Sequence, residues 1–194
     1  MRRYLVLTII LIVVSSAVGL YFFNQYWIHR YDELIARHAS VYGLEENLVW
    51  SVIYQETYFQ AWKIGADKEV GLMQVTPAVA REWAKKTQLR EFEKQTEENV
   101  NEFLRDPETN IQVGCWYLGK MRENYRGLPA ETAMSLAAYN AGASRVTDWS
   151  KSPEEAKKLT QEQFIENINI PSTKAYVSEI LERKSERARE HNLY

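Results

Sequence analysis

The sequence predicts a mainly α-helical protein, with one compact helical domain, at most a small β element, and a single membrane-spanning helix in front of it. Apolar residues recur three, four and seven positions apart along most of the chain, which is the pattern of amphipathic helices. Alternating strand patterns are weak everywhere, and the 194 residues have room for one ordinary domain plus an extension. We expect a membrane anchor and juxtamembrane segment at 1–30, the domain at 31–181 and a polar helix end at 182–194.

An uncharged, mainly apolar run at residues 4–23 follows Arg2 and Arg3. Its length of about 20 residues matches what a helix needs to cross a bilayer. A cleavable signal peptide is the alternative, because residues 17–19 resemble a small-residue cleavage site, but the apolar run continues beyond them to Phe23. We therefore expect an uncleaved, single-pass anchor in the cytoplasmic (inner) membrane, with the basic N-terminus inside and the domain outside.

The domain begins with an amphipathic helix at 31–42, which Gly43 ends. The next helix has Glu45 and Glu46 in its first turn, where the helix dipole favours acids. Periodicity then disappears at 60–75, and two glycines there indicate a loop or small hairpin. The remaining expected elements are a helix from Pro77 to about Lys86, an acidic solvated helix or lobe at 91–102, a helix from Asp106-Pro107 to about Tyr125, an alanine-rich helix at 130–140 ended by Gly142, and a final helix after Pro171 with Tyr176, Val177, Ile180 and Leu181 on its buried face.

Composition excludes several classes of function. The net charge of -2, without a dense basic stripe, argues against a nucleic-acid partner. Cys115 is the single cysteine, so no internal disulfide and no thiolate metal cluster can form. The three histidines, His29, His38 and His191, are too scattered to indicate a metal site. We expect neither a metal nor a cofactor.

Glu56 is the residue that points most directly to chemistry. Residues three, four and seven apart share one helix face, so Glu56 lies on the same apolar face as Val49, Val52 and Ile53. Burial penalises the charged form and raises the pKa of a carboxyl group, which suits a proton donor near neutral pH. The structural alternative is a buried glutamate paired with an arginine or lysine.

Three short motifs accompany the predicted helices. The first is QETYF at 55–59, the second GLMQVTP at 71–77, and the third AAYNAG at 137–142. In the second, glycine permits close backbone approach, Met73 provides flexible apolar packing, and Gln74 offers a donor and an acceptor to a polar ligand. In the third, a helix ends by presenting Tyr139 and Asn140, with Gly142 allowing the turn. Each motif taken singly is more often structural than functional.

Together, in this order, the motifs resemble the lytic transglycosylases of the soluble Slt type (family 1), whose catalytic domain has a lysozyme-like fold. The family pattern has Glu-Ser, then Gly-Leu-Met-Gln, then Ala-Tyr-Asn-Ala-Gly, then an Ile-Pro-x-Thr-x-x-Tyr-Val segment. The chain carries a version of each, and the helix from Asp106 also looks like this family's. The resemblance covers roughly residues 31–181.

By position, the resemblance makes Glu56 the sole catalytic acid and Tyr139 the active-site tyrosine. It places Thr57, Met73, Gln74 and Asn140 among the substrate-binding residues. The implied substrate is the glycan strand of peptidoglycan, cut between N-acetylmuramic acid and N-acetylglucosamine on the periplasmic or cell-wall side of the membrane. Glu56 would serve first as acid and then as base, giving a 1,6-anhydromuramic product, while Tyr139 would orient Glu56 or the substrate's acetamido group by a hydrogen bond.

Several positions depart from the family pattern. Thr57 replaces the usual serine, and Thr76 stands where methionine is common. Ser172 and Lys174 fill positions where glutamate and arginine are usual, and Ser172 is expected to cap the helix after Pro171. Five aromatic residues are candidates for stacking on sugars, although more than half of them are expected in the core. They are Tyr58, Phe59, Trp62, Trp83 and Trp149.

Two alternative functions stay open at this point. A hydrolytic muramidase would cut the same bond with water, and Asp67 or Glu69 could supply its general base. A non-catalytic peptidoglycan-binding module of an envelope protein complex is the other. Under every reading the expected partners are glycan strands and, through residues 4–23, the cytoplasmic membrane.

Overall fold

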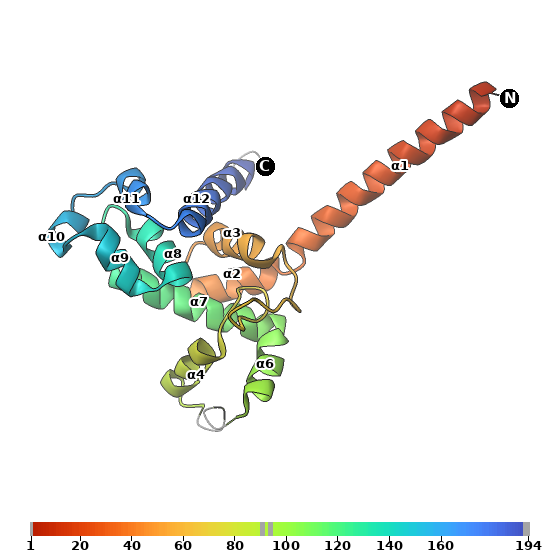
Figure 1. The fold of residues 1–194 in the computed structure, drawn as a ribbon. Helices are drawn as coiled ribbons and strands as arrows, with labels where there is room; N and C mark the ends of the chain where they lie inside the picture. The colour runs from red at the N-terminus through yellow and green to blue at the C-terminus, as the bar shows by residue number, and fades with distance from the viewer. Residues whose placement is uncertain (1, 90–91, 93–94, 192–194) are drawn as a thin grey trace.

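The computed structural model describes residues 2–89, 92 and 95–191. In Figure 1, one body contains α2, α3, α7, α8 and α12. Helices α4 and α6 form a lobe at one end of this body, and α1 projects away from the body. The helices are α1 (Arg2–His29), α2 (Asp32–Val41), α3 (Glu46–Thr57), α4 (Pro77–Lys86), α6 (Glu97–Arg105), α7 (Pro107–Asn124), α8 (Glu131–Ala141), α9 (Ala143–Ser150), α10 (Pro153–Ala156), α11 (Gln161–Asn167) and α12 (Pro171–His191). The prediction of a mainly helical protein is confirmed.

The core lies between α3, α7, α8 and α12. The apolar face of α3 is completely buried at Val49, Val52 and Ile53, and α12 packs on it with Val177 and Ile180. Helix α8 packs against both α7 and α12. This packing brings the C-terminal ends of α3 and α8 and the first turns of α12 to one place.

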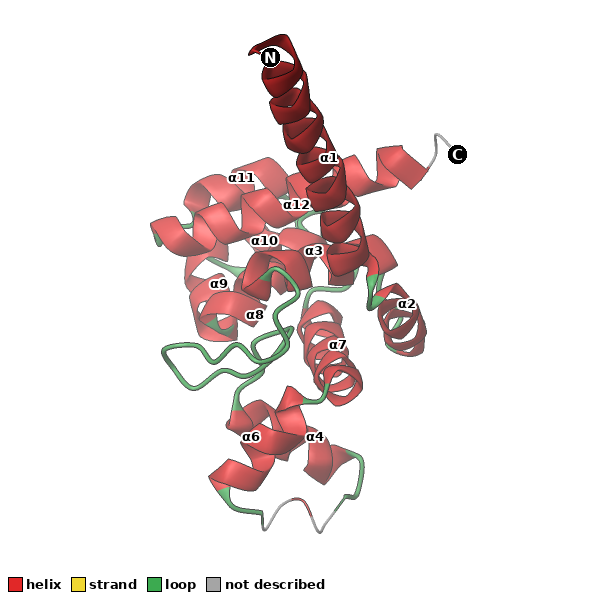
Figure 2. Ribbon diagram, turned by 90° about the vertical axis from the view of Figure 1, so that its right-hand side faces the viewer, coloured by secondary structure: helices red, strands yellow, loops and turns green. Residues whose placement is uncertain are grey.

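A compact loop connects α3 to α4, as Figure 2 shows in green. Its pairing consists of two isolated antiparallel bridges, Ile64 with Val70 and Val70 with Val75. The described part of the chain contains no longer strand. The expected loop or small hairpin at 60–75 is therefore confirmed.

Helix starts follow their capping signals. The Thr76 hydroxyl accepts a hydrogen bond from the Val79 amide before α4, and the Asp106 carboxylate accepts one from the Thr109 amide before α7. The expectation for Ser172 was wrong: α12 already begins at Pro171, so Ser172 lies inside its first turn. A proline suits the first helical position because its missing N–H would have no partner there.

The expected acidic, solvated helix at 91–102 corresponds to α6, since residues 95–99 and 102 are exposed and Val100 alone is buried among the described residues of that segment. Helix α6 buries Val100 and Leu104 completely and packs on α4 and α7, while Glu97 and Glu98 stand in its first turn. Residues 91, 93 and 94 of the predicted segment lie outside the described residues.

Three helices between Gly142 and Pro171 had not been predicted. Helices α9, α10 and α11 have 8, 4 and 7 residues, which is too short for a clear apolar period. Two of them carry readable start signals: Ser152 before Pro153, and a capping box between Thr160 and Gln163.

Helix α1 stands apart from the rest. It has no buried residue, and its side chains are exposed from Arg2 to Phe23. It is the one helix in the described part of the chain that is long and apolar enough to cross a membrane, judged by length and composition.

Candidate active site

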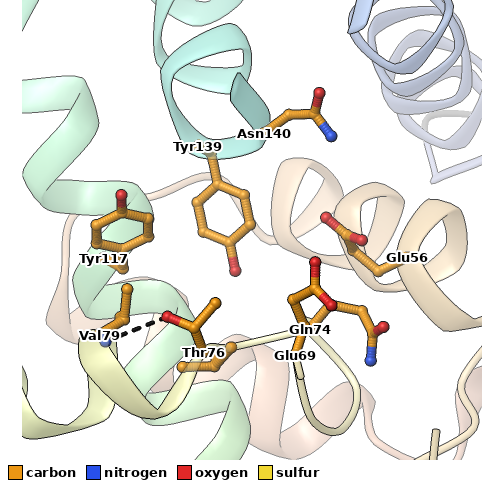
Figure 3. A pocket seen from close by; sticks show the side chains of 9 residues that line it. Glu56, Glu69, Gln74, Thr76, Val79, Tyr117, Tyr139 and Asn140 are labelled. Carbon is orange, nitrogen blue, oxygen red and sulfur yellow. Dashed lines mark hydrogen bonds between the residues drawn. The ribbon is translucent and has the colours of Figure 1, made fainter. Parts of the chain in front are cut away.

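A pocket of about 180 Å³ lies where the loop and the helix ends meet. Figure 3 shows the side chains of Glu56, Glu69 and Tyr139 pointing into it from different elements. It is lined by Glu56, Glu69, Gln74, Val75, Thr76, Val79, Tyr117, Tyr139 and Asn140. The structure thus brings all three sequence motifs to one cavity.

Glu56 sits in the last turn of α3 and is half-buried at the pocket wall. Burial raises the pKa of its carboxyl group from 4.5 to about 7, and the nearby Glu69 carboxylate adds to the rise. A hydrogen bond from Tyr176 and the charge of Lys63 act in the opposite direction and lower this pKa. The Lys63 ammonium group bonds the backbone carbonyl of Glu56, and within the described residues no ion pair reaches the Glu56 carboxylate. The arrangement fits a proton donor better than a structural ion pair.

Tyr176 is the direct partner of Glu56. Its hydroxyl donates to Glu56 Oε1 over 2.7 Å from the buried face of α12. Burial raises the pKa of Tyr176 well above its usual value, so the hydroxyl keeps its proton. The sequence placed Tyr176 on a buried helix face and gave it no role in the site. Its position in the segment IPSTKAYV at 170–177, which matches the family's Ile-Pro-x-Thr-x-x-Tyr-Val pattern, was the signal that could have identified it.

The substitution Tyr176→Phe is expected to change the pH profile of catalysis. A protonated Glu56 is needed for acid catalysis, so the rate should fall as pH rises through about 7. Tyr176 stabilises the carboxylate form, so losing its hydroxyl raises the pKa of Glu56 and moves this alkaline limb to higher pH. The maximal rate should also fall several-fold, because the acid loses a positioning contact. Rate measurements from pH 4 to 9, with Tyr125→Phe as control, test this; an unmoved limb would contradict it.

Tyr139 is held at the pocket wall by the backbone of the second motif. Its hydroxyl donates to the Met73 carbonyl over 2.7 Å, and its ring lies 5.3 Å from that of Tyr117. Of the two partners expected for the Tyr139 hydroxyl, Glu56 is bonded by Tyr176 instead, and the contact with the substrate's acetamido group stays a prediction. Tyr139 still faces the pocket, where a ligand could reach its ring.

The loop of the second motif is anchored by Asn110 of α7, which is completely buried. Its side-chain oxygen accepts from the Met73 amide over 2.8 Å, and its amide group donates to the carbonyls of Val70 and Leu104, each over 2.8 Å. Gly71 has a φ of +75°, and a Cβ there would lie 2.3 Å from Asn110 Nδ2. Only glycine fits this close approach.

Gln74 occupies a left-handed corner of the same loop, with φ +47°. Its amide group donates to the carbonyl of Gly71 over 2.9 Å and that of Lys63 over 3.3 Å. Its side-chain oxygen is the remaining polar atom that a ligand could use. Two more residues, Tyr58 (φ +50°) and Phe59 (φ +62°), turn the chain in the same way directly after α3.

Thr57 and Met73 lie behind the pocket wall. Thr57 is 3% exposed, and its hydroxyl donates to the carbonyls of Ile53 and Leu72 over 3.2 and 3.0 Å. Met73 is 0% exposed and packs on Gly114, since a Cβ added to Gly114 would lie 2.4 Å from the Met73 sulfur. Neither side chain is among those that line the cavity, so their assignment to the substrate-binding residues stays a prediction without a direct contact in this structure.

Asn140 and Thr76 do line the pocket. The Asn140 side-chain oxygen accepts from the Thr173 hydroxyl over 2.8 Å, which fixes the amide and leaves its N–H groups for a ligand. Ser172 and Lys174 are outside the lining, and Lys174 bonds the Glu166 carbonyl instead.

The two acids that could serve a muramidase as general base, Asp67 and Glu69, lie in different surroundings. Glu69 lines the pocket, and its carboxylate accepts from the Asp67 amide over 2.9 Å. Asp67 is exposed and lies outside the lining. Of the five candidate stacking aromatics, Phe59, Trp83 and Trp149 are in the core, as expected for more than half of them, and none of the five lines the pocket.

The chain is similar to known lytic murein transglycosylases. Residues 33–162 match the model of the transglycosylase SLT domain. The chain is 29% identical over 154 residues to the soluble lytic murein transglycosylase of Escherichia coli K12, covering 78% of this chain and 22% of that protein. It is 28% identical over 123 residues to the membrane-bound lytic murein transglycosylase C of Yersinia pestis (strain Pestoides F), covering 61% of this chain and 33% of the relative.

Solved structures show the same fold. The lytic transglycosylase Slt of Pseudomonas aeruginosa, solved as an inactive mutant, has a TM-score of 0.71 and 25% identity, covering 86% of this chain and 25% of that one. A 70-kDa soluble lytic transglycosylase in complex with bulgecin A has the same TM-score and identity, with 84% and 25% coverage. The chain thus spans between about a fifth and a third of the length of the relatives it matches. It belongs to the SLT transglycosylase domain family.

Proposed function

We propose that the chain is a membrane-anchored lytic transglycosylase that cleaves the β-1,4 bond between N-acetylmuramic acid and N-acetylglucosamine in peptidoglycan. The family and the activity for which its relatives are named support this, and so does a pocket that holds a carboxyl group with a pKa of about 7. The position of Glu56 in the pocket, together with the raised pKa of its carboxyl group, is the observation that carries the proposal. We propose residues 31–181 as the catalytic domain and residues 4–23 as its anchor in the cytoplasmic membrane, with an envelope protein complex as a further partner.

The proposed mechanism uses Glu56 twice. Protonated Glu56 donates to the glycosidic oxygen as the C1–O bond breaks, and the acetamido oxygen of the muramic residue bonds C1 and carries the positive charge. The Glu56 carboxylate then takes the proton of the muramic 6-hydroxyl, whose oxygen attacks C1 and displaces the acetamido oxygen. The 1,6-anhydro ring closes and Glu56 is protonated again. A pKa near 7 suits both steps, because both forms of the group are accessible at neutral pH.

Mass analysis of digested cell wall tests the proposal. A transglycosylase releases fragments that lack one water and have no reducing end, whereas hydrolysis leaves ordinary reducing ends. We expect the first kind alone. Reducing ends would overturn the transglycosylase in favour of a muramidase, and wall binding without cleavage by the wild-type chain would favour the binding module.

Hydrolysis is the second candidate because Glu69 lines the pocket together with Glu56. If Glu69 were the base that activates water, Glu69→Gln would abolish turnover. We expect instead that the products stay unchanged and the alkaline limb moves to lower pH. The reason is that the Glu69 charge raises the pKa of Glu56, so its removal lowers that pKa. Asp67→Asn is the matched control, since Asp67 is exposed and outside the pocket.

The anchor is tested separately by sequencing the N-terminus of the mature protein. We expect the chain to retain residues 4–23. A start near Leu20 would contradict the anchor and leave the catalytic proposal untouched.

A further inference from the structure

The exposed part of α1 ends where its contact with the body begins. Every side chain from Arg2 to Phe23 is exposed, and Asn24 is the first that is partly buried. The Tyr58 hydroxyl donates to the Asn24 side chain. No spacer therefore separates the apolar run from the folded body, and a membrane that held the run would lie directly against that body.

Hydrogen bonds attach the end of α1 to the segment that follows Glu56. The Trp27 indole donates to the Tyr58 carbonyl over 2.9 Å, and Arg30 donates to the Phe59 carbonyl. The Trp50 indole of α3 also donates to the Ile28 carbonyl of α1, over 3.0 Å. These contacts leave α1 little freedom to swing relative to α3.

A row of aromatic rings continues from the apolar run onto the body. The rings of Phe23 and Trp27 lie 5.9 Å apart, and those of Trp27 and Trp62 lie 5.8 Å apart in an edge-on contact. Trp62 is nevertheless 61% exposed, and Ile64 beside it is 52% exposed. Large apolar side chains that are exposed together at the end of an apolar helix indicate a site of contact with a membrane or another protein.

The dimensions of a lipid bilayer indicate that these side chains contact a membrane. Trp27 follows Phe23 by four residues, which is about 6 Å along a helix. Each polar headgroup layer is about 5–8 Å deep, and tryptophan and tyrosine are enriched there. We propose that Trp27, Tyr58, Trp62 and Ile64, the interfacial collar, lie in the headgroup layer of the lipid bilayer, so that the body rests on the membrane. This rests on the anchor given under the proposed function.

Charges near the collar suit a lipid surface. The Arg30 guanidinium stacks 3.4 Å from the Trp27 ring centre, and Lys63 is exposed between Trp62 and Ile64. Both cations could meet lipid phosphates. Lys63 also bonds the Glu56 carbonyl, and its own carbonyl accepts from Gln74, so the collar and the pocket wall share one loop. The pocket is then held close to the membrane, where it can act on glycan next to the bilayer.

Site-directed spin labelling of the full chain in phosphatidylcholine–phosphatidylglycerol nanodiscs tests the collar. Trp62→Cys and Ile64→Cys report on it, and Leu89→Cys is the control, because Leu89 is 46% exposed on the lobe beyond α4. Native Cys115 is completely buried and burial raises the pKa of its thiol, so it should not react. Collisions with a water-soluble nickel chelate should be several-fold rarer at 62 and 64 than at 89, and collisions with oxygen more frequent.

Each outcome decides one question. If the chain stays in the discs through an alkaline wash but labels at 62 and 64 meet the nickel chelate as often as the label at 89, the collar is refuted and the anchor stands. If the chain is lost from the discs, the anchor fails and the collar with it. Both results are independent of wall cleavage.

Discussion

Turnover of peptidoglycan by the Glu56→Gln variant is expected to fall by about 10³-fold, in the middle of the range that general acid–base groups contribute. Glutamine has the size of glutamate and an oxygen that can still accept from the Tyr176 hydroxyl, which now bonds Glu56 Oε1 over 2.7 Å. What it lacks is a transferable proton. Because one group acts first as acid and then as base, a single substitution removes both proton transfers.

The measurement is the release of soluble fragments from purified wall at pH 6 to 7. Glu46→Gln is the matched control, since Glu46 belongs to the same helix but is exposed in its first turn. The variant chain should still bind wall. Unchanged fragment release by Glu56→Gln would show that the acid has been misassigned.

Asn110→Ala is expected to have the largest effect on stability. Asn110 makes three hydrogen bonds to backbone groups of the second motif and its neighbours. Without it the Met73 amide and the Leu104 carbonyl would lose their partner in the interior, while the Val70 carbonyl would keep its bond from the Val75 amide. An unsatisfied buried polar group costs about 1–3 kcal/mol, so we expect the free energy of unfolding to fall by about 3–5 kcal/mol. Activity should fall as well, since the Met73 backbone that holds Tyr139 would be released.

Denaturant unfolding of the detergent-solubilised chain, followed by tryptophan fluorescence, measures this loss. Asn99→Ala is the control, because Asn99 is exposed on α6 and its amide bonds only the nearby Gln95 among the contacts described. Its effect should stay within about 0.5 kcal/mol. Equal losses for the two variants would mean that Asn110 does not hold the loop.

Most long helices were predictable because their apolar period and their caps agree. Helix α4 runs from Pro77 to Lys86 as the sequence indicates, and α7 ends one residue before Tyr125. The short helices α9 to α11 were missed, since a stretch of 4 to 8 residues cannot show a period of 3.6. Local signals such as the Thr160 capping box were then the remaining guide.

The site was predictable in its members more than in its contacts. Motif order indicated Glu56, Gln74, Tyr139 and Asn140, and all four line the pocket. Motif order could not show which tyrosine reaches Glu56, because that depends on how α12 packs on α3. Tyr176 and Glu56 are 120 residues apart in sequence. Nor could motif order show that the Thr57 side chain is buried, because residues next to each other on a helix point in different directions.

The left-handed corners at Tyr58, Phe59 and Gln74 have a consequence for how this chain would respond to selection. Residues other than glycine adopt this conformation at a cost of about 1–2 kcal/mol each. Glycine would relax the backbone at such a corner, although at Phe59 it would also remove a completely buried ring and lower stability. At Gln74 the same change would remove an amide from the pocket. Pressure for thermal tolerance alone would therefore draw position 74 away from the residue that the cavity uses, and only continued demand for the activity would keep glutamine there.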